Sequence, residues 1–372
     1  MPDSKSLLAK LIGFHSVVGQ PNSEIIDFVR NYVESYGLTP HVIAGPDPER
    51  SNLFVSIGPL STGGIILSAH LDVVPADEPD WKADPFSMRQ EGDALIGRGA
   101  CDMKGFAAVV LASIPKLAVA RLKRPVHIAF SYDEEAGCLG VPHLIAAIPG
   151  LCEHAPIACI VGEPTGLHPV LRHKGKCAAR IRAVGVTGHS SRPDLGKNAI
   201  HLLTGALNQV LSLKDKLQSD GPFDDRFSPN YSTIQVGRIG GGRAVNVIPD
   251  HAEADIEIRT IPGVSAKETI ETLIQKIQIE AGLLGEIISS YPPLSLDAES
   301  PLAKLATEIS GKTIVEAVSF GTEGGLFESA GIPTVICGPG DVRRAHKSEE
   351  FIRLTEMNEC DRMIERLACT LC

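Results

Sequence analysis

The sequence predicts an α/β fold in which a mixed, mostly parallel sheet forms a larger domain that is interrupted by a smaller ferredoxin-like α+β domain. Outside the insert, short apolar runs are nearly continuous rather than alternating, as strands covered on both faces require. Between residues 177 and 289 the pattern changes to alternating strands separated by helical stretches. We therefore expect a first part at residues 1–176, the insert at residues 177–289 and a second part at residues 290–372.

The elements of the larger domain follow from the spacing of its apolar residues. A helix is expected to begin near Asn22, because Ile25, Ile26, Val29 and Val33 share one face. The other elements predicted for this domain are the strands Leu53–Ile57, Ile65–Ala69, Val126–Ser131, Ile157–Val161 and Thr334–Cys337, and the helices Met103–Val119 and Pro142–Ala147.

The insert is predicted to have the order strand, helix, strand, strand, helix, strand, which is the ferredoxin-like order. Alternation of apolar and charged residues in 254–259 indicates that its sheet has one face in water. The predicted elements are Ala178–Thr187, Asn198–Leu217, Tyr231–Ile239, Ala252–Arg259, Ala266–Gly282 and Glu286–Ser289.

Composition excludes several classes of partner. The 372 residues carry a formal charge of −10, and no basic run offsets it, which argues against nucleic acid and against anionic membranes. Nine cysteines, an odd number without a disulfide-framework spacing, are typical of reduced thiols, so we expect a cytoplasmic location. The most apolar stretch, residues 106–120, is broken by Pro115 and Lys116 and is too short to span a bilayer.

Acidic and imidazole side chains follow the predicted strands, where open α/β sheets form their ligand sites. Two histidines with several carboxylates and no thiolate are typical of a divalent metal site, and here they suffice for two ions. Any one of these residues is an ordinary loop residue, and only the set is informative. The candidates are His70, Asp72, Asp102, Glu134, Glu135, Glu163 and His346.

Local patterns suggest roles for some of these residues. His70 and Asp72 are two residues apart at a strand end, so both point the same way and Asp72 is expected to hold the second nitrogen of His70. Asp102 lies in a glycine-rich segment at the start of a helix, where it is either a helix cap or a ligand. In the acidic run of residues 133–135 we assign Glu135 to a metal and Glu134 to proton transfer; a solvated acidic turn is the alternative.

Five motifs in order along the chain resemble a known family. They are H-x-D-V-V-P at residue 70, G-R-G-x-x-D-M-K-G at residue 97, D-E-E-x-G at residue 133, G-E-P-T at residue 162 and A-H-K at residue 345. They resemble the dinuclear zinc hydrolases that include acetylornithine deacetylase, succinyl-diaminopimelate desuccinylase, aminoacylase and carboxypeptidase G. Within that family the segment Ser319–Phe327 looks most like the acetylornithine deacetylases.

The resemblance implies two metal ions that share the carboxylate of Asp102. One ion is held by Asp102 with His70 and Glu163, and the other by Asp102 with Glu135 and His346. Zinc is the expected metal, and a site of histidines and carboxylates also accepts cobalt or manganese.

The resemblance also assigns residues to the reaction. It implies that Glu134 is the general base, that Asp72 orients the first histidine, and that His189 of a lid motif stabilises the oxyanion, often across a dimer. It further implies that Asn246 and Arg259 hold the substrate carboxylate. We therefore expect the insert to act as a lid and as the interface of a homodimer.

The expected substrate is a small N-acylated amino acid, preferably N2-acetyl-L-ornithine, which would be cleaved to L-ornithine and acetate in arginine biosynthesis. Glu323 is our candidate partner for the ornithine ammonium group. The nearest alternatives are a related N-acyl-amino-acid deacylase, a desuccinylase or a dipeptidase. A non-catalytic metal-binding protein is the alternative from another class, and the presence of Glu134 argues against it.

Overall fold

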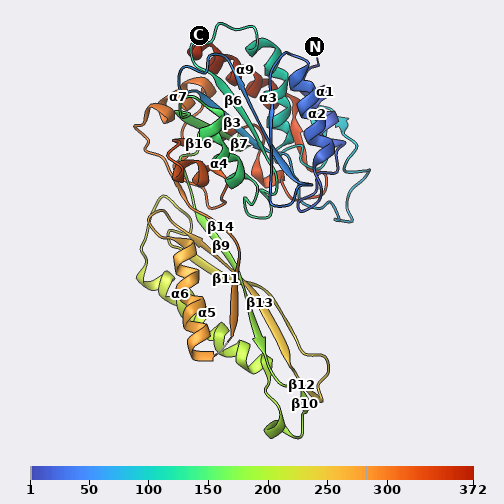
Figure 1. Ribbon diagram of the computed structural model, residues 1–372, viewed down its shortest axis with the longest axis vertical. Coiled ribbons are helices and arrows are strands. Elements are labelled where there is room, and N and C mark those ends of the chain that lie inside the picture. The colour runs from blue at the N-terminus through green and yellow to red at the C-terminus, as the bar shows by residue number, and fades with distance from the viewer. Residues whose placement is uncertain (1, 282) are drawn as a thin grey trace. The chain divides into compact units, whose positions relative to one another are not determined.

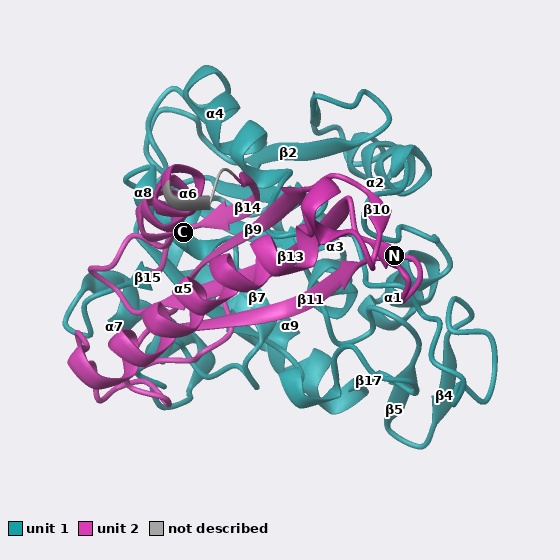
Figure 2. Ribbon diagram, turned by 90° about the horizontal axis from the view of Figure 1, so that it is seen from below, with its two compact units in different colours: residues 1–172, 294–316, 322–372 teal, residues 173–293, 317–321 magenta. Residues whose placement is uncertain are grey.

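The computed structural model describes residues 2–281 and 283–372 and separates into two compact units (Figure 2). Unit 1 comprises Met1–Arg172, Leu294–Glu316 and Thr322–Cys372, and unit 2 comprises His173–Pro293 and Ala317–Gly321. The predicted insert, residues 177–289, lies within the long segment of unit 2. Gly282, where we expected a helix to end, lies outside the described residues.

Unit 1 is built on a six-stranded sheet in the order β1-β2-β6-β3-β7-β16 (Figure 1). The neighbours among β6, β3, β7 and β16 pair in parallel, which gives the predicted mixed, mostly parallel sheet. Its strands are β1 (His41–Ala44), β2 (Ser51–Ile57), β3 (Ile65–His70), β6 (Val126–Ser131), β7 (Ala158–Pro164) and β16 (Thr334–Gly338).

Strand β2 differs from the parallel pairing that its nearly continuous apolar run, Leu53–Ile57, led us to expect. β2 pairs antiparallel with β1 and with β6, where Leu53 lies opposite Phe130. The connection between β1 and β2 is too short for the crossover that parallel neighbours need. A fully buried apolar run shows that a strand is covered but not in which direction it pairs, so the prediction for Leu53–Ile57 was wrong in this respect.

Side chains alternate between the two faces of this sheet. Leu67 and Ala69 of β3 belong to the main apolar core together with α3, whereas Ser68 and His70 point to the other face. Helices α1, α2, α3, α7 and α9 contribute to that core, and α4 and α8 contact each other and the sheet. The helices are α1 (Ser4–Ile12), α2 (Ser23–Glu34), α3 (Lys104–Leu117), α4 (Val141–Leu151), α7 (Pro301–Ser310), α8 (Gly324–Ser329) and α9 (Leu354–Leu371).

A small three-stranded sheet in unit 1 has the order β17-β5-β4. It consists of β4 (Arg89–Glu91), β5 (Ala94–Ile96) and β17 (Phe351–Arg353), so it joins segments that lie far apart in the sequence. The 3₁₀ helix η2 (Val342–Arg344) precedes β17, and the short strands β8 (Arg172–His173) and β15 (Leu294–Ser295) lie where the chain passes between the units.

Unit 2 has the predicted order of elements, and its sheet is antiparallel with the order β11-β13-β9-β14. Buried and exposed residues alternate along β9 and β13, and helices α5 and α6 cover the buried face. The elements are β9 (Gly175–Val184), β10 (Gly188–His189), η1 (Pro193–Leu195), α5 (Ala199–Asp220), β11 (Thr233–Gly241), β12 (Val247–Ile248), β13 (His251–Thr260), α6 (Ala266–Ala281) and β14 (Leu284–Tyr291).

Among the described residues no helix is long and apolar enough to cross a membrane.

Candidate metal centre

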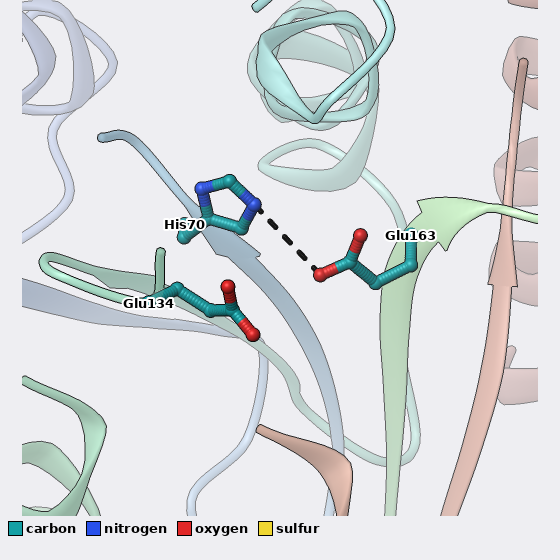
Figure 3. A group of neighbouring side chains, drawn as sticks. All are labelled: His70, Glu134 and Glu163. Atoms are coloured by element: carbon teal, nitrogen blue, oxygen red, sulfur yellow. Dashed lines mark ion pairs between the residues drawn. The ribbon is translucent and has the colours of Figure 1, made fainter. Parts of the chain in front are cut away.

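Three neighbouring parallel strands end at one place in unit 1. His70 is the last residue of β3, Glu163 lies near the end of β7, and Glu134 follows β6. Because the carboxyl ends of parallel strands meet at one edge of the sheet, these side chains converge, as Figure 3 shows. One ligand atom from each of the three lies within 4.8 Å of the others.

A glycine before Glu163 allows this convergence. The aromatic ring of Phe106, on α3, packs directly against β7 at Gly162, where a Cβ atom would lie only 2.0 Å from the ring. Any larger residue would push β7 away from α3. The close packing therefore fixes the position of Glu163 relative to the start of α3, and so relative to Asp102.

Asp102 lies between the two histidines. Its Oδ1 is 3.0 Å from Nε2 of His70, and its Oδ2 is 3.4 Å from Nε2 of His346. Glu163 Oε1 is 3.7 Å from the same atom of His70, and Glu135 Oε1 is 2.8 Å from the same atom of His346. These contacts connect the five predicted ligands through Asp102, which lies against both histidines, and donor atoms of His70, Asp102 and Glu135 also lie within 4.8 Å of one another.

The chemistry of these donors fits two divalent cations. Burial and the nearby charge of Asp102 raise the pKa of Glu163 well above its ordinary value. Hydrogen bonds to Asp102 and Glu135 raise the pKa of His346 to about 10. So many carboxylates in one enclosed place repel one another unless positive charge compensates them, and imidazole nitrogen and carboxylate oxygen are donors that zinc accepts. His70, Asp102 and Glu163 would hold one ion, and Asp102, Glu135 and His346 the other.

Asp72 contacts His70 differently from our prediction. The hydrogen bond from His70 Nδ1 goes to the backbone carbonyl of Asp72 at 2.9 Å, and the nearest carboxylate oxygen of Asp72 is 3.6 Å away. That carboxylate instead accepts hydrogen bonds from the backbone N–H groups of Glu134 at 3.2 Å and Glu135 at 3.1 Å. The spacing of two residues indicated proximity correctly, but it did not show that the loop after β6 would compete for the same oxygens.

Glu134 has the environment expected of a group that exchanges protons. Removal from solvent, together with the charges of Glu135, Asp72 and Asp102, raises its pKa to about 8 against the opposing effect of His70. The Cys138 thiol donates a hydrogen bond to its Oε1 at 3.3 Å. A carboxylate that holds a proton near neutral pH can both accept and return one.

The structure does not support our assignment of Glu323 to the substrate. This side chain is 1% exposed, and its two oxygens accept hydrogen bonds from Ser68 on β3 and Ser131 on β6. Both carboxylate oxygens are thus engaged inside unit 1. The conspicuous G-T-E-G-G loop suggested a binding residue, whereas the glycines let Glu323 enter the sheet face at the start of α8.

The remaining predicted residues lie in unit 2. His189 is exposed on β10, which pairs with β12, and the backbone carbonyl of Asn246 accepts the N–H of Ser190 at 3.1 Å, so these loops are adjacent. Arg259 lies near the far end of β13, where it donates to Glu257 at 2.6 Å and to the Tyr291 hydroxyl at 2.8 Å.

Arg259 is therefore remote from the other two within one chain. The eight-residue span from His251 to Arg259 along β13 corresponds to roughly 27 Å of extended strand. His189 and Asn246 belong to the end of unit 2 that is next to His251, because β12 immediately precedes β13. A single unit 2 does not bring the three side chains together.

Comparisons with known proteins identify the family. The model of Peptidase family M20/M25/M40 matches residues 66–370 of this chain. An acetylornithine deacetylase from Photorhabdus laumondii subsp. laumondii is 30% identical over 388 aligned residues, which cover 100% of this chain and 98% of that protein. One from Myxococcus xanthus is 31% identical, with 100% of this chain and 98% of that protein covered.

Solved structures share the fold at lower identity. The M20 family metallo-carboxypeptidase Sso-CP2 from Sulfolobus solfataricus has a TM-score of 0.81 at 20% identity, with 99% of each chain covered. The YXEP protein from Bacillus subtilis, a dinuclear metal binding peptidase from the M20 family, has a TM-score of 0.63 at 18% identity, with 99% of this chain and 97% of that chain covered.

The chain belongs to Peptidase family M20/M25/M40, which confirms the family resemblance read from its motifs. It is a metallohydrolase of the acetylornithine deacetylase-like kind, and its family implies a dinuclear metal site.

Proposed function

We propose that the chain hydrolyses N2-acetyl-L-ornithine to L-ornithine and acetate in the cytoplasm, as a step of arginine biosynthesis. The observation that carries this proposal is similarity over the full length to acetylornithine deacetylases, at 30% identity. With Glu323 engaged by Ser68 and Ser131, the choice of ornithine rests on this similarity alone.

The proposed chemistry divides among the residues of unit 1. Two divalent ions, zinc or cobalt, would supply positive charge that polarises the scissile amide and lowers the pKa of the attacking water. Glu134 would accept a proton from the water and deliver it to the leaving amine, because a carboxylate beside the site can carry a proton in both directions. Asp72 would keep the loop of Glu134 and Glu135 against β3, because it accepts both of their N–H groups.

The residues of unit 2 would recognise the substrate. Arg259 would pair with the α-carboxylate, and it is pre-oriented because Glu257 and Tyr291 hold two of its nitrogen atoms. Asn246 would assist in this recognition. His189 would donate to the oxyanion, and its other nitrogen is held by Ser191, whose hydroxyl lies 2.7 Å from Nδ1.

The separation of His189 from Arg259 supports a homodimer in which one chain completes the site of the other. Strand β11 is an edge of the antiparallel sheet and leaves its outer backbone groups available for pairing. Large apolar side chains are exposed in the same unit, including Ile239 at 62%, Leu195 at 63% and Val245 at 102%. A second copy would cover such a surface.

A panel of N-acylated amino acids tests the substrate, with the liberated amine as the readout. It should contain N2-acetyl-L-ornithine, neutral N-acetyl amino acids, an N-succinyl amino acid and a dipeptide, each measured with and without a chelator. The proposal expects the highest kcat/KM for acetylornithine and no activity after chelation. A higher value for a neutral N-acetyl amino acid, for the succinyl compound or for the dipeptide would replace the proposed substrate and keep the reaction class.

A further inference from the structure

One buried carboxylate holds the loop that carries Asp102. Oε1 of Glu350 accepts the backbone N–H of Cys101 at 2.9 Å and that of Asp102 at 3.0 Å, and Oε2 accepts the N–H of Gly99 at 3.1 Å. The Glu350 side chain is 1% exposed. Hydrogen bonds from amides to a charged acceptor are stronger than neutral ones, and burial strengthens them further. The backbone at Asp102 is therefore set by Glu350.

Strand pairing places Glu350 beside this loop. Strands β5 and β17 run antiparallel, with Ile96 opposite Phe351, so that Gly97 leaves one strand where Glu350 enters the other. The N–H of Gly97 donates to the Glu350 carbonyl at 2.9 Å and continues the ladder by one more bond. The contact between Glu350 and the Asp102 loop is thus built into the backbone of unit 1.

A buried arginine extends the contact to the segment of His346. Nη1 of Arg98 donates to Glu350 at 3.0 Å and to the carbonyl of Lys347, the residue after His346, at 3.2 Å. Nη2 of Arg98 donates to the carbonyl of Pro75 at 3.1 Å. The Arg98 side chain is also 1% exposed, and it forms ion pairs with both Glu350 and Glu78. Arg98 and Glu350 together connect the Asp102 loop with the His346 segment.

The two metal groups depend on this connection to different degrees. His70 and Glu163 lie on adjacent strands of the six-stranded sheet, whose ladder fixes their spacing. Asp102 and His346 lie in loops, and their spacing of 3.4 Å between Oδ2 and Nε2 is set by the segments that Glu350 and Arg98 join. A change at Glu350 should therefore disturb the second group more than the first.

We propose that Glu350 is a positioning residue that sets the spacing of Asp102 and His346, and so determines how tightly the chain holds the ion of the Asp102, Glu135 and His346 group. Sequence reasoning missed it because Glu350 reads as the second acid of a Ser-Glu-Glu run in a loop. The inference rests on the proposed metal pair and is independent of the proposed substrate.

The test is a calorimetric titration of the metal-free, full-length chain with Co²⁺, followed in parallel by the visible absorption of the bound ion. The wild type should take up two equivalents. Glu350→Gln should bind one equivalent as the wild type does and the other roughly 10- to 100-fold more weakly, the range typical of lost support to a ligand. Glu349→Gln is the matched control, because this neighbouring carboxylate contacts Lys82 and Arg89 instead, and it should keep both equivalents.

Two results would overturn the proposal: unchanged affinity for both equivalents in Glu350→Gln, or an equal loss of both. A wild-type chain that binds fewer than two ions would contradict the metal pair itself, and the inference with it, whatever the substrate panel gives. Circular dichroism and thermal unfolding of the metal-free variants report folding. If Glu350→Gln does not fold, Arg98→Lys takes its place; a lysine cannot reach all the partners of Arg98, so the same equivalent should weaken, and unchanged binding would overturn the proposal.

Discussion

Unit 1 buries most of its proposed functional side chains, with His346 half-exposed as the exception, whereas unit 2 exposes most of its own. His70 is 1% exposed, Glu163 6% and Asp102 9%, while His189 on the short strand β10 and Asn246 in the turn before β12 are exposed. Buried strand ends hold donors at fixed distances, as ion binding requires, and exposed loops can meet a substrate or a second copy. Substitutions in unit 1 should therefore alter turnover and metal content, and substitutions in unit 2 should alter substrate recognition and dimer assembly.

The largest effect is expected at Glu134. Glu134→Gln should lower kcat by about 10³-fold, because the proton carrier is lost, and should retain the metal content of the wild type. Turnover and elemental analysis measure the two outcomes, and Glu153→Gln, an exposed acid of the same unit, is the control. Loss of an ion would show that Glu134 is a ligand, since it lies within 4.8 Å of His70 and Glu163 donor atoms.

His189 in unit 2 should have the next largest effect. His189→Ala should lower kcat by about 10²-fold with metal content unchanged, because one oxyanion donor is removed. The exposed His201 on α5 provides the control variant His201→Ala, which should keep full activity. A change in metal content on losing His189 would break the proposed division between the units.

Co-expression of two inactive variants tests whether His189 completes the site of a partner chain. Co-expressed His189→Ala and Glu134→Gln chains should regain about a quarter of wild-type activity if His189 acts across a dimer, because half the dimers then contain one complete site. Light scattering establishes the assembly, and turnover of the mixture gives the result. Activity no higher than that of the separate variants would place His189 and Glu134 in the same chain's site.

Arg259 should affect recognition rather than chemistry. Arg259→Met should raise KM roughly 10- to 50-fold for substrates with a free α-carboxylate, with little change in kcat, because the charged partner of the carboxylate is lost. Arg182→Met removes an arginine of the central strand β9 that pairs with Glu286 at 2.9 Å, and it serves as the control. An equal rise in KM for an α-carboxamide substrate would indicate a structural role instead.

The smallest effect concerns stability, where the two units should behave alike. Burial lowers the pKa of His127 in unit 1 and of His173 in unit 2 to about 4. Below pH 6.5 the unfolded chain takes up protons that the folded chain does not, so stability falls as pH drops from 6.5 to 4 and this loss is complete below pH 4. Each histidine should account for about 2 kcal/mol of the unfolding free energy that is lost between pH 7 and pH 5.

Urea unfolding of His127→Gln and His173→Gln at pH 7 and pH 5 measures how much of the lost unfolding free energy each histidine accounts for. Each variant should show a smaller loss of unfolding free energy on acidification than the wild type. An unchanged difference between pH 7 and pH 5 in both variants would contradict the assignment of the loss to these histidines.

Much of this organisation could be predicted from the sequence, because local patterns carry it. Continuous apolar runs located β3, β6, β7 and β16, and alternation located the antiparallel sheet of unit 2. The donors after those strands then converge by the geometry of a parallel sheet. The direction of β2 could not be predicted, since burial is the same for either direction of pairing.

Several individual hydrogen bonds could not be predicted, because each side chain has more than one possible partner and the sequence does not show which one it contacts. The Asp72 carboxylate accepts from the loop after β6, while only the backbone carbonyl of Asp72 accepts from His70, and Glu323 accepts from two serines on different strands. Glu350 reaches the Asp102 loop only because β5 and β17 pair across most of the chain length. Each case joins residues distant in sequence through single hydrogen bonds, without a pattern that marks them.

The most direct test of the two-ion site is a chelation and reconstitution series on the wild-type chain. Ions should be removed completely, turnover of the best substrate of the panel measured, and Zn²⁺ or Co²⁺ returned in measured amounts. The account predicts no turnover in the metal-free chain and full recovery at two ions per chain. Full turnover by a chain free of divalent ions would contradict it.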